Sequence, residues 1–269
     1  MTRPITFLSD YGLADEFVGV VHGVIAGICP DARVIDITHG IPRQDVRAGA
    51  EVLARALPYL PAGVHLAVID PDVGARRRAL ALRTAEDGRL LVGPDNGLLA
   101  AAAEQFGGVA EAVEISASPW RLEPVSATFH GRDIFAPVAA RLACGAPLAS
   151  AGTPLDPAEL VTIERTQPRQ EQGALVAHVV GTDGFGNAVL DAGHDDLVES
   201  DLRLGDAVAA RAGSRRVRGV VARTFSDVAP GGLLLYEDAG GSLALAVNGG
   251  DASALLGLRA GDEVRLEAG

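Results

Sequence analysis

Acidic and imidazole side chains follow the ends of several apolar runs in this 269-residue sequence. Carboxylates and imidazoles can move protons, orient a water molecule, or bind hydroxyl and ammonium groups. A single Asp before a Gly is commonly part of a turn, but five such clusters are hard to explain as turns alone. The clusters are Asp10-Tyr11-Gly12, His39-Gly40, Asp70-Pro71-Asp72-Val73-Gly74, Pro94-Asp95-Asn96-Gly97 and Phe129-His130-Gly131-Arg132-Asp133. We therefore expect a polar site where these clusters meet.

The sequence lacks the motifs of several common enzyme classes. It contains no lysine, which excludes a Walker-type phosphate loop and a lysine Schiff base. Neither a Gly-x-Ser-x-Gly elbow nor a Gly-x-Gly-x-x-Gly run after the first strand is present. No two histidines lie within five residues of each other, so we expect no metal and no cofactor. The histidines outside the clusters are assigned structural roles: His22, His65, His178 and His194.

The elements that position these clusters alternate between strand and helix in the first half of the chain. Apolar runs predict strands over 5–9, 33–38, 64–69, 79–82 and 90–93. Helical periodicity predicts helices over 15–29, 45–57, 97–106 and 133–144, the first two opening at Asp15 and Asp45. This alternation predicts a three-layer α/β domain with a mostly parallel sheet. In such sheets ligands bind beyond the carboxyl ends of the strands, where four of the five clusters fall.

The second half of the chain has the pattern of an all-β domain. Short apolar runs separated by turn residues cover 174–180, 188–190, 207–211, 217–223, 233–236, 242–247 and 263–266. Close spacing of this kind predicts a small barrel or sandwich. We place the boundary near 160–172, which gives an α/β domain over 1–165 and a β-barrel domain over 172–269.

Composition and charge limit the partners. A net charge of −12, without an arginine-rich run, argues against nucleic acid as a partner. No apolar stretch approaches the roughly 20 residues of a membrane span, so a soluble protein is expected. Cys29 and Cys144 are isolated in apolar stretches, which predicts buried free thiols and a reducing, cytoplasmic location.

Taken together, the polar strings resemble one family over essentially the whole chain. They are similar to the S-adenosyl-L-methionine hydroxide adenosyltransferases, which are related to the enzymes that make fluorinated and chlorinated deoxyadenosine. The strings in the first half are Ser9-Asp10-Tyr11-Gly12-x-x-Asp15, Asp70-Pro71-Asp72-Val73-Gly74-x-x-Arg77-Arg78, Gly93-Pro94-Asp95-Asn96-Gly97-Leu98-Leu99 and Thr128-Phe129-His130-Gly131-Arg132-Asp133. Those in the second half are Asp183-Gly184-Phe185-Gly186-Asn187, Thr224-Phe225-Ser226-Asp227 and Ala246-Val247-Asn248.

The resemblance implies a fold, a reaction and a set of site residues. The implied fold is an α/β domain followed by a β-barrel, in a homotrimer with its sites at subunit interfaces. The implied reaction is hydrolysis of S-adenosyl-L-methionine to adenosine and L-methionine, with Asp70, Arg77 and His130 holding the attacking water. Asp10 would grip the ribose hydroxyls, and Asp15 and Asp183 would bind the methionine ammonium. The other residues expected around the substrate, chiefly its adenine, are Asp95, Asn96, Phe185, Asn187, Phe225, Asn248 and Gly249.

Two residues depart from the family pattern, and two other functions stay open. Asp72 stands in place of a glycine beside Asp70, and Ala239 stands where a serine would help to hold the methionine carboxylate. An anionic Asp70 would repel a halide, which favours water over halide as the nucleophile. The alternatives are a halide-dependent adenosyl transfer and a catalytically silent trimer that binds S-adenosyl-L-methionine or adenosine.

Overall fold

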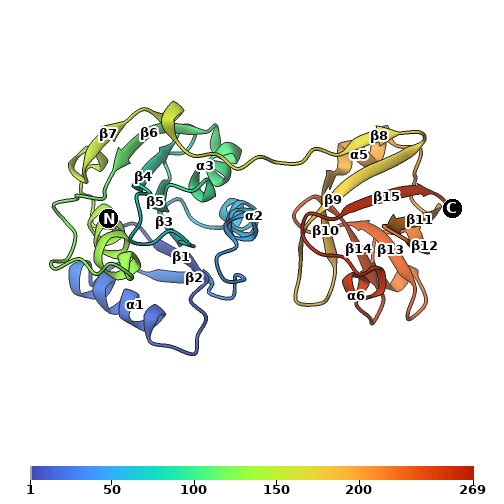
Figure 1. Cartoon of the computed structure of the whole chain (residues 1–269), viewed down its shortest axis with the longest axis horizontal. Helices are drawn as coiled ribbons and strands as arrows, with labels where there is room; N and C mark the ends of the chain where they lie inside the picture. Colours follow the sequence, from blue (N-terminus) through green and yellow to red (C-terminus); the bar gives the residue numbers. More distant parts are fainter. Residues whose placement is uncertain (1) are drawn as a thin grey trace. The chain divides into compact units, whose positions relative to one another are not determined.

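The computed structural model describes residues 2–269, and these form two compact units (Figure 1). The first unit ends at Ile163 and the second begins at Glu164. Within residues 2–269, no helix combines the length and the apolar character that crossing a membrane requires.

The first unit is built on a seven-stranded sheet with the order β2-β1-β3-β5-β4-β6-β7. Strands β2, β1, β3 and β5 are parallel neighbours, and β4, β6 and β7 continue the sheet in antiparallel fashion. The strands are β1 (Ile5–Ser9), β2 (Val34–Thr38), β3 (Val64–Val68), β4 (Ala79–Thr84), β5 (Leu90–Pro94), β6 (Val109–Glu114) and β7 (Thr153–Leu155). The helices are α1 (Phe17–Ile28), α2 (Val46–Ala56), α3 (Leu98–Ala103) and α4 (Ala136–Ala143), with short turns η1 (Leu57–Tyr59), η2 (Glu104–Phe106), η3 (Gly131–Phe135), η4 (Leu148–Ser150) and η5 (Pro157–Glu159).

Helices cover both faces of this sheet, as the predicted three-layer architecture requires. Successive residues of a strand point to opposite faces, and in β3 Leu66 joins the core beneath α1 and α4 whereas Ala67 joins the core beneath α2 and α3. Asp45 accepts a hydrogen bond from the backbone N–H of Ala48 and caps α2 as expected. Asp15 does not cap α1, because that helix begins at Phe17 with Glu16 at its N-cap.

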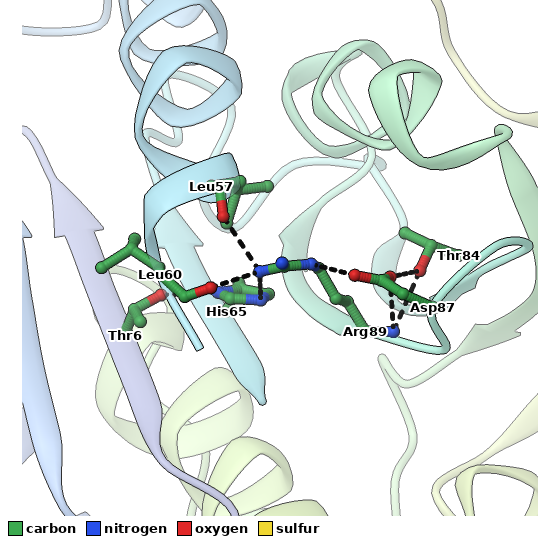
Figure 2. A network of polar contacts seen from close by, with 7 residues as sticks. All are labelled: Thr6, Leu57, Leu60, His65, Thr84, Asp87 and Arg89. Atoms are coloured by element: carbon green, nitrogen blue, oxygen red, sulfur yellow. Dashed lines mark hydrogen bonds and ion pairs between the residues drawn. The ribbon is translucent and has the colours of Figure 1, made fainter. Parts of the chain in front are cut away.

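A buried polar network fixes the amino-terminal ends of three strands, away from the polar clusters (Figure 2). His65 in β3 contacts Thr6 in β1 through Nδ1 at 2.8 Å. Arg89, directly before β5, donates to the carbonyls of Leu57 and Leu60 at 3.0 and 2.9 Å and is paired with Asp87. Burial and the Arg89 guanidinium lower the pKa of His65 to about 3, so the ring is neutral. The structural role predicted for His65 agrees with this network.

The cysteines form a disulfide, so the prediction of free thiols was wrong. Cys29 lies at the C-terminal end of α1 and Cys144 at the C-terminal end of α4. Both helices pack on the same face of the sheet, which brings the two Cα atoms to 6.0 Å across a sequence separation of 115 residues. Such a separation leaves no local signal in the sequence. The argument for a reducing compartment from free thiols therefore falls away.

The second unit is a closed β-barrel. Its sheet has the order β10-β14-β13-β12-β11-β15-β9-β8, and pairing of β10 with β9 closes a ring of seven strands with β8 outside it. The strands are β8 (Arg169–Glu171), β9 (Ala174–Thr182), β10 (Ala188–Gly193), β11 (Ala207–Ala212), β12 (Arg215–Val221), β13 (Leu233–Glu237), β14 (Ser242–Val247) and β15 (Glu263–Ala268). Helices α5 (His194–Glu199) and α6 (Ala252–Leu256) and turn η6 (Phe225–Asp227) lie in its connections. All seven strands expected from the apolar runs are present.

Candidate functional site

Two aspartates follow neighbouring parallel strands at one edge of the first sheet. Strands β1 and β3 are in register up to the pair Ser9 and Val68. Asp10 comes directly after β1, and Asp70 comes two residues after Val68. Parallel strands end at the same edge, so the fold places both carboxylates on the side where ligands bind in α/β sheets.

Asp70, Arg77 and His130 form a continuous chain of contacts at this edge. The Arg77 guanidinium donates Nε–H to Asp70 Oδ1 at 2.8 Å and Nη2–H to Asp70 Oδ2. The same Nη2 donates to His130 Nδ1 at 2.8 Å. Asp70 and Arg77 are each 8 % exposed, so this is a nearly buried, bidentate ion pair. Asp70 therefore acts on His130 through Arg77.

The contact with Arg77 defines the state of His130. An arginine has no lone pair to offer, so Nδ1 of His130 must be the acceptor and the ring is neutral. Burial first, and the Arg77 charge second, lower the pKa of His130 below its usual value, although Asp70 and Asp133 oppose this. Arg77 also lies over the Phe135 ring, 5.2 Å from its centroid, which adds a cation–π contact.

A glycine permits the close approach that joins the two loops. Gly74 has φ +79°, and a Cβ there would lie 2.3 Å from the backbone oxygen of Ala127. The loop after β3 thus packs directly against the segment that leads to His130. Asp133 holds that segment, since its carboxylate accepts from the backbone N–H of Ser126 at 2.8 Å and from Arg132.

Tyr11 lies at the same site, although the sequence argument gave it no separate role. A Cβ on Gly131 would lie 2.1 Å from the Tyr11 hydroxyl oxygen, so a larger residue after His130 would displace the Tyr11 side chain. Burial, together with the charges of Asp10 and Asp70, raises the pKa of Tyr11 far above its usual value. Tyr11 is therefore a protonated phenol. The sequence signal that could have identified Tyr11 as a site residue was its position within the Asp10-Tyr11-Gly12 string.

The predicted pair Asp95 and Asn96 is engaged with the protein itself. Antiparallel β4 begins where β5 ends, which places Arg78 beside Asp95 with Nε donating to Oδ2 at 2.7 Å. The other Asp95 oxygen accepts from the Val161 N–H at 3.0 Å. Asn96 donates to the Ile69 carbonyl at 2.8 Å, directly before Asp70. These contacts brace the edge that carries the triad, and contact with substrate stays a prediction for both residues.

The remaining acidic residues of this edge differ in exposure. Asp10 is half-buried and accepts from the Gln44 N–H at 2.8 Å. Asp15 is exposed at the start of α1. Asp72, whose direction the sequence left open, is exposed, in contrast to the nearly buried Asp70 carboxylate.

Arg77 and His130 line a cavity of about 450 Å³ in the first unit. Its wall is otherwise formed by the segment before His130 and by the residues after β6, among them Ser116, Arg121 and Val125. A volume of this size admits several water molecules beside the triad.

The second unit contains its own cavity of about 630 Å³. The five residues there that the resemblance assigns to the adenine line it together: Phe185, Asn187, Phe225, Asn248 and Gly249. Phe185 is 83 % exposed and Phe225 39 % exposed. Exposed aromatic rings beside a cavity are suited to stack on a flat ligand.

Asp183 organises the loop that carries this cavity's first wall. Its Oδ1 accepts from the N–H groups of Phe185 and Asn187 at 2.9 and 3.0 Å, and its Oδ2 accepts from the Asn187 side chain at 2.8 Å. Asp238, next to Ala239, likewise accepts from the Gly240 N–H at 2.8 Å and orders its own turn. Binding of an ammonium by Asp183 stays a prediction.

These observations define a two-unit protein in which an α/β sheet carries a carboxylate–guanidinium–imidazole triad and a barrel carries an aromatic-walled cavity. The sequence profile of the SAM hydroxide adenosyltransferase N-terminal domain matches residues 5–152, and that of the C-terminal domain matches residues 177–265. The chain belongs to the SAM hydroxide adenosyltransferase family.

Individual relatives agree with this assignment. The chain is 53% identical over 267 residues to the (R)-S-adenosyl-L-methionine hydrolase of Salinispora tropica, covering 98% of both proteins. A crystal structure of an uncharacterized conserved protein from Thermotoga maritima superimposes with a TM-score of 0.92 at 39% identity, covering 98% of this chain and 99% of that one. The fluorinase of Nocardia brasiliensis is more distant, at 29% identity over 99% of this chain and 98% of its own.

Proposed function

We propose that this protein hydrolyses S-adenosyl-L-methionine to adenosine and L-methionine. The observation that carries the proposal is the chain of contacts from Asp70 through Arg77 to His130, of which Arg77 and His130 line a cavity able to hold water. The Salinispora tropica relative, 53% identical over nearly the whole chain, bears the name (R)-S-adenosyl-L-methionine hydrolase, which supports the same reaction.

The triad holds and polarises the nucleophilic water. Neutral His130 has Nδ1 occupied by Arg77, which leaves Nε2 to contact the water. The Arg77 cation lowers the pKa of a water molecule beside it, because a nearby positive charge favours hydroxide. Asp70 keeps the guanidinium in place by its bidentate contact. Orienting a nucleophile in line with the bond to be broken can contribute roughly 7–11 kcal/mol to lowering the barrier.

The leaving group explains why we propose a reaction without a cofactor. Water forms a bond to the ribose C5′, and the C5′–S bond breaks with its electron pair staying on sulfur. The sulfonium thereby becomes the neutral thioether of methionine, so it needs neither a general acid nor a Lewis acid to depart. The proton lost from the water passes to solvent through the cavity beside the triad.

Substrate contacts come from both units in this proposal. The adenine stacks in the barrel cavity between Phe185 and Phe225. The Asp10 carboxylate accepts from the ribose hydroxyls, and Asp15 and Asp183 bind the methionine ammonium by charge-assisted hydrogen bonds. We further propose a homotrimer in which the parts of each site meet across subunit boundaries.

The proposal is tested by incubating purified protein with S-adenosyl-L-methionine in a chloride-containing buffer and resolving the products by mass-detected chromatography. Adenosine with an equal amount of methionine is the expected result. Chlorodeoxyadenosine would instead indicate halide-dependent adenosyl transfer. Tight adenosine binding without any product would indicate a silent binding protein.

The proposed trimer has a test of its own. Light scattering should give three times the chain mass of 27.6 kDa. Specific activity should fall on dilution in step with dissociation. A fully active monomer would contradict sites at subunit interfaces.

A further inference from the structure

Two histidines and an aspartate meet at the outer edge of the first sheet, apart from the triad. His22 comes from the second turn of α1, Asp36 from edge strand β2, and His39 directly follows that strand. One potential ligand atom from each lies within 4.8 Å of the other two. His22 Nε2 is 2.9 Å, and His39 Nε2 is 3.1 Å, from the same Asp36 oxygen, Oδ1.

The buried histidine of this cluster has an unused ring nitrogen. The His39 side chain is 3 % exposed, and its ring packs on Phe7 with centroids 4.6 Å apart. Its Nδ1 contacts Ser9 Oγ at 2.7 Å. Among the residues that the structure describes, its Nε2 has no hydrogen-bond partner, because Asp36 is near but poorly aligned. A buried nitrogen without a partner is costly, which calls for a ligand at this point.

The arrangement has the features of a metal site with one open position. Metal-bound histidines commonly hold their second nitrogen against a polar partner, as Ser9 holds His39 Nδ1. Ligand atoms about 2.1 Å from a tetrahedral ion lie roughly 3.4 Å apart. The two histidine nitrogens lie near that distance from Asp36 Oδ1, at 2.9 and 3.1 Å, and all three ligand atoms lie within 4.8 Å of one another. His22 and Asp36 are 36 % and 40 % exposed, which leaves a route for the ion and room for a water ligand.

We propose that His22, Asp36 and His39 bind one divalent first-row transition ion of the Zn²⁺ type. Two imidazoles and one carboxylate suit such an ion, whereas Mg²⁺ and Ca²⁺ prefer oxygen ligands throughout. The ion joins α1 to the edge strand. It also steadies the loop of Asp10, since the His39 carbonyl accepts the Gly12 N–H at 2.8 Å.

The ion takes no part in the bond-making and bond-breaking step of the proposed hydrolysis. The site departs from the expectation of no metal, which rested on motifs whose ligands are close in sequence. Here the ligands come from a helix and a strand, 14 and 3 residues apart. No compact pattern could have indicated them.

The test is a titration of chelator-treated, tag-free protein with Co²⁺, whose tetrahedral complexes absorb visibly. We expect one equivalent to bind, Zn²⁺ to displace it, Mg²⁺ not to displace it, and the unfolding temperature to rise with Zn²⁺. His22→Gln and Asp36→Asn, both at half-exposed positions, should each weaken Co²⁺ binding at least tenfold.

His194→Gln is the matched control. His194 is also exposed and also contacts a carboxylate, with Nδ1 3.0 Å from Glu237, but lies in the barrel unit. The His194→Gln variant should bind Co²⁺ with the same affinity as the unaltered protein. The proposal is overturned if the unaltered protein takes up no equivalent of Co²⁺, or if His22→Gln and Asp36→Asn bind it as tightly as the control does.

Discussion

Arg77 occupies the middle of the triad and connects its two other members. Its guanidinium is nearly buried and donates to both Asp70 and His130. A buried charge that loses its partner is strongly destabilising, so a substitution of Asp70 alone or of Arg77 alone leaves the other charge unpaired. The charge of Asp70 is thus required both for the local fold and for the orientation of Arg77.

Asp70→Asn should reduce kcat by about 10²- to 10⁴-fold, the usual contribution of a group that handles the reacting proton or nucleophile. The amide keeps the shape of the side chain but loses the bidentate acceptor for Arg77. Steady-state release of adenosine measures the effect. Asp72→Asn, two residues away and exposed, is the matched control and should stay near the unaltered rate. Equal losses of activity in both variants would contradict the role that we assign to Asp70 in the triad.

The lowered pKa of His130 predicts the pH profile. The neutral ring accepts from Arg77, and protonation at low pH would place two cations together. The ratio kcat/KM should therefore be level above pH 7 and fall on an acid limb centred below 6.5, the ordinary value for histidine. His130→Gln should be slow and should lack this limb. A limb centred above 6.5 would contradict the neutral, Arg77-bonded state.

At the scale of elements, the loop after β3 depends on Gly74. Gly74→Ala should destabilise the protein by at least about 2 kcal/mol and lower activity, because it combines a strained φ with a collision against the Ala127 oxygen. Gly88→Ala in the turn between β4 and β5 is the matched control, since Gly88 has φ +67° and open space around it.

Gly88→Ala should lower the free energy of unfolding by about 1 kcal/mol, which is the cost of a positive φ without any collision. The variant should keep full activity. Urea unfolding and initial rates measure both variants. If the two variants behave alike, the close approach to Ala127 does not position the triad.

The main strands and helices could be predicted from the sequence, because their apolar periodicity is strong and local. It missed β6, in which Val109, Ala110 and Glu111 are not buried, and it missed β7, a three-residue strand containing a proline. The expected helix over 133–144 begins as the π-helical turn η3, a form without a distinct sequence period.

The candidate site was predictable in part for a similar reason. Aspartates that follow parallel strands must share an edge, so Asp10 and Asp70 could be grouped from the sequence. The contact between Arg77 and His130 joins loops 53 residues apart and depends on tertiary packing at Gly74. The sequence also could not show which carboxylates bind groups of the protein itself. Asp95, for example, accepts a hydrogen bond from Arg78, and only the fold reveals this contact.

At the scale of the molecule, the disulfide ties the ends of α1 and α4 across most of the first unit. Closing a long loop limits the unfolded chain and typically contributes about 2–4 kcal/mol. Cys144→Ala should lower the free energy of unfolding by that amount and leave kcat unchanged at 25 °C, since the bond lies away from the triad. Denaturation with and without reductant is the measurement. Two titratable thiols in the untreated, native protein would contradict the bond.

In the proposed reaction, a water molecule held by the triad attacks the ribose C5′. The most direct test is turnover of S-adenosyl-L-methionine in water enriched in ¹⁸O, followed by mass analysis of both products. If water is the nucleophile, one ¹⁸O atom enters the 5′-hydroxyl of adenosine, and methionine gains none during turnover. Adenosine without the label would contradict this reaction, because its 5′-oxygen would then have come from a source other than water.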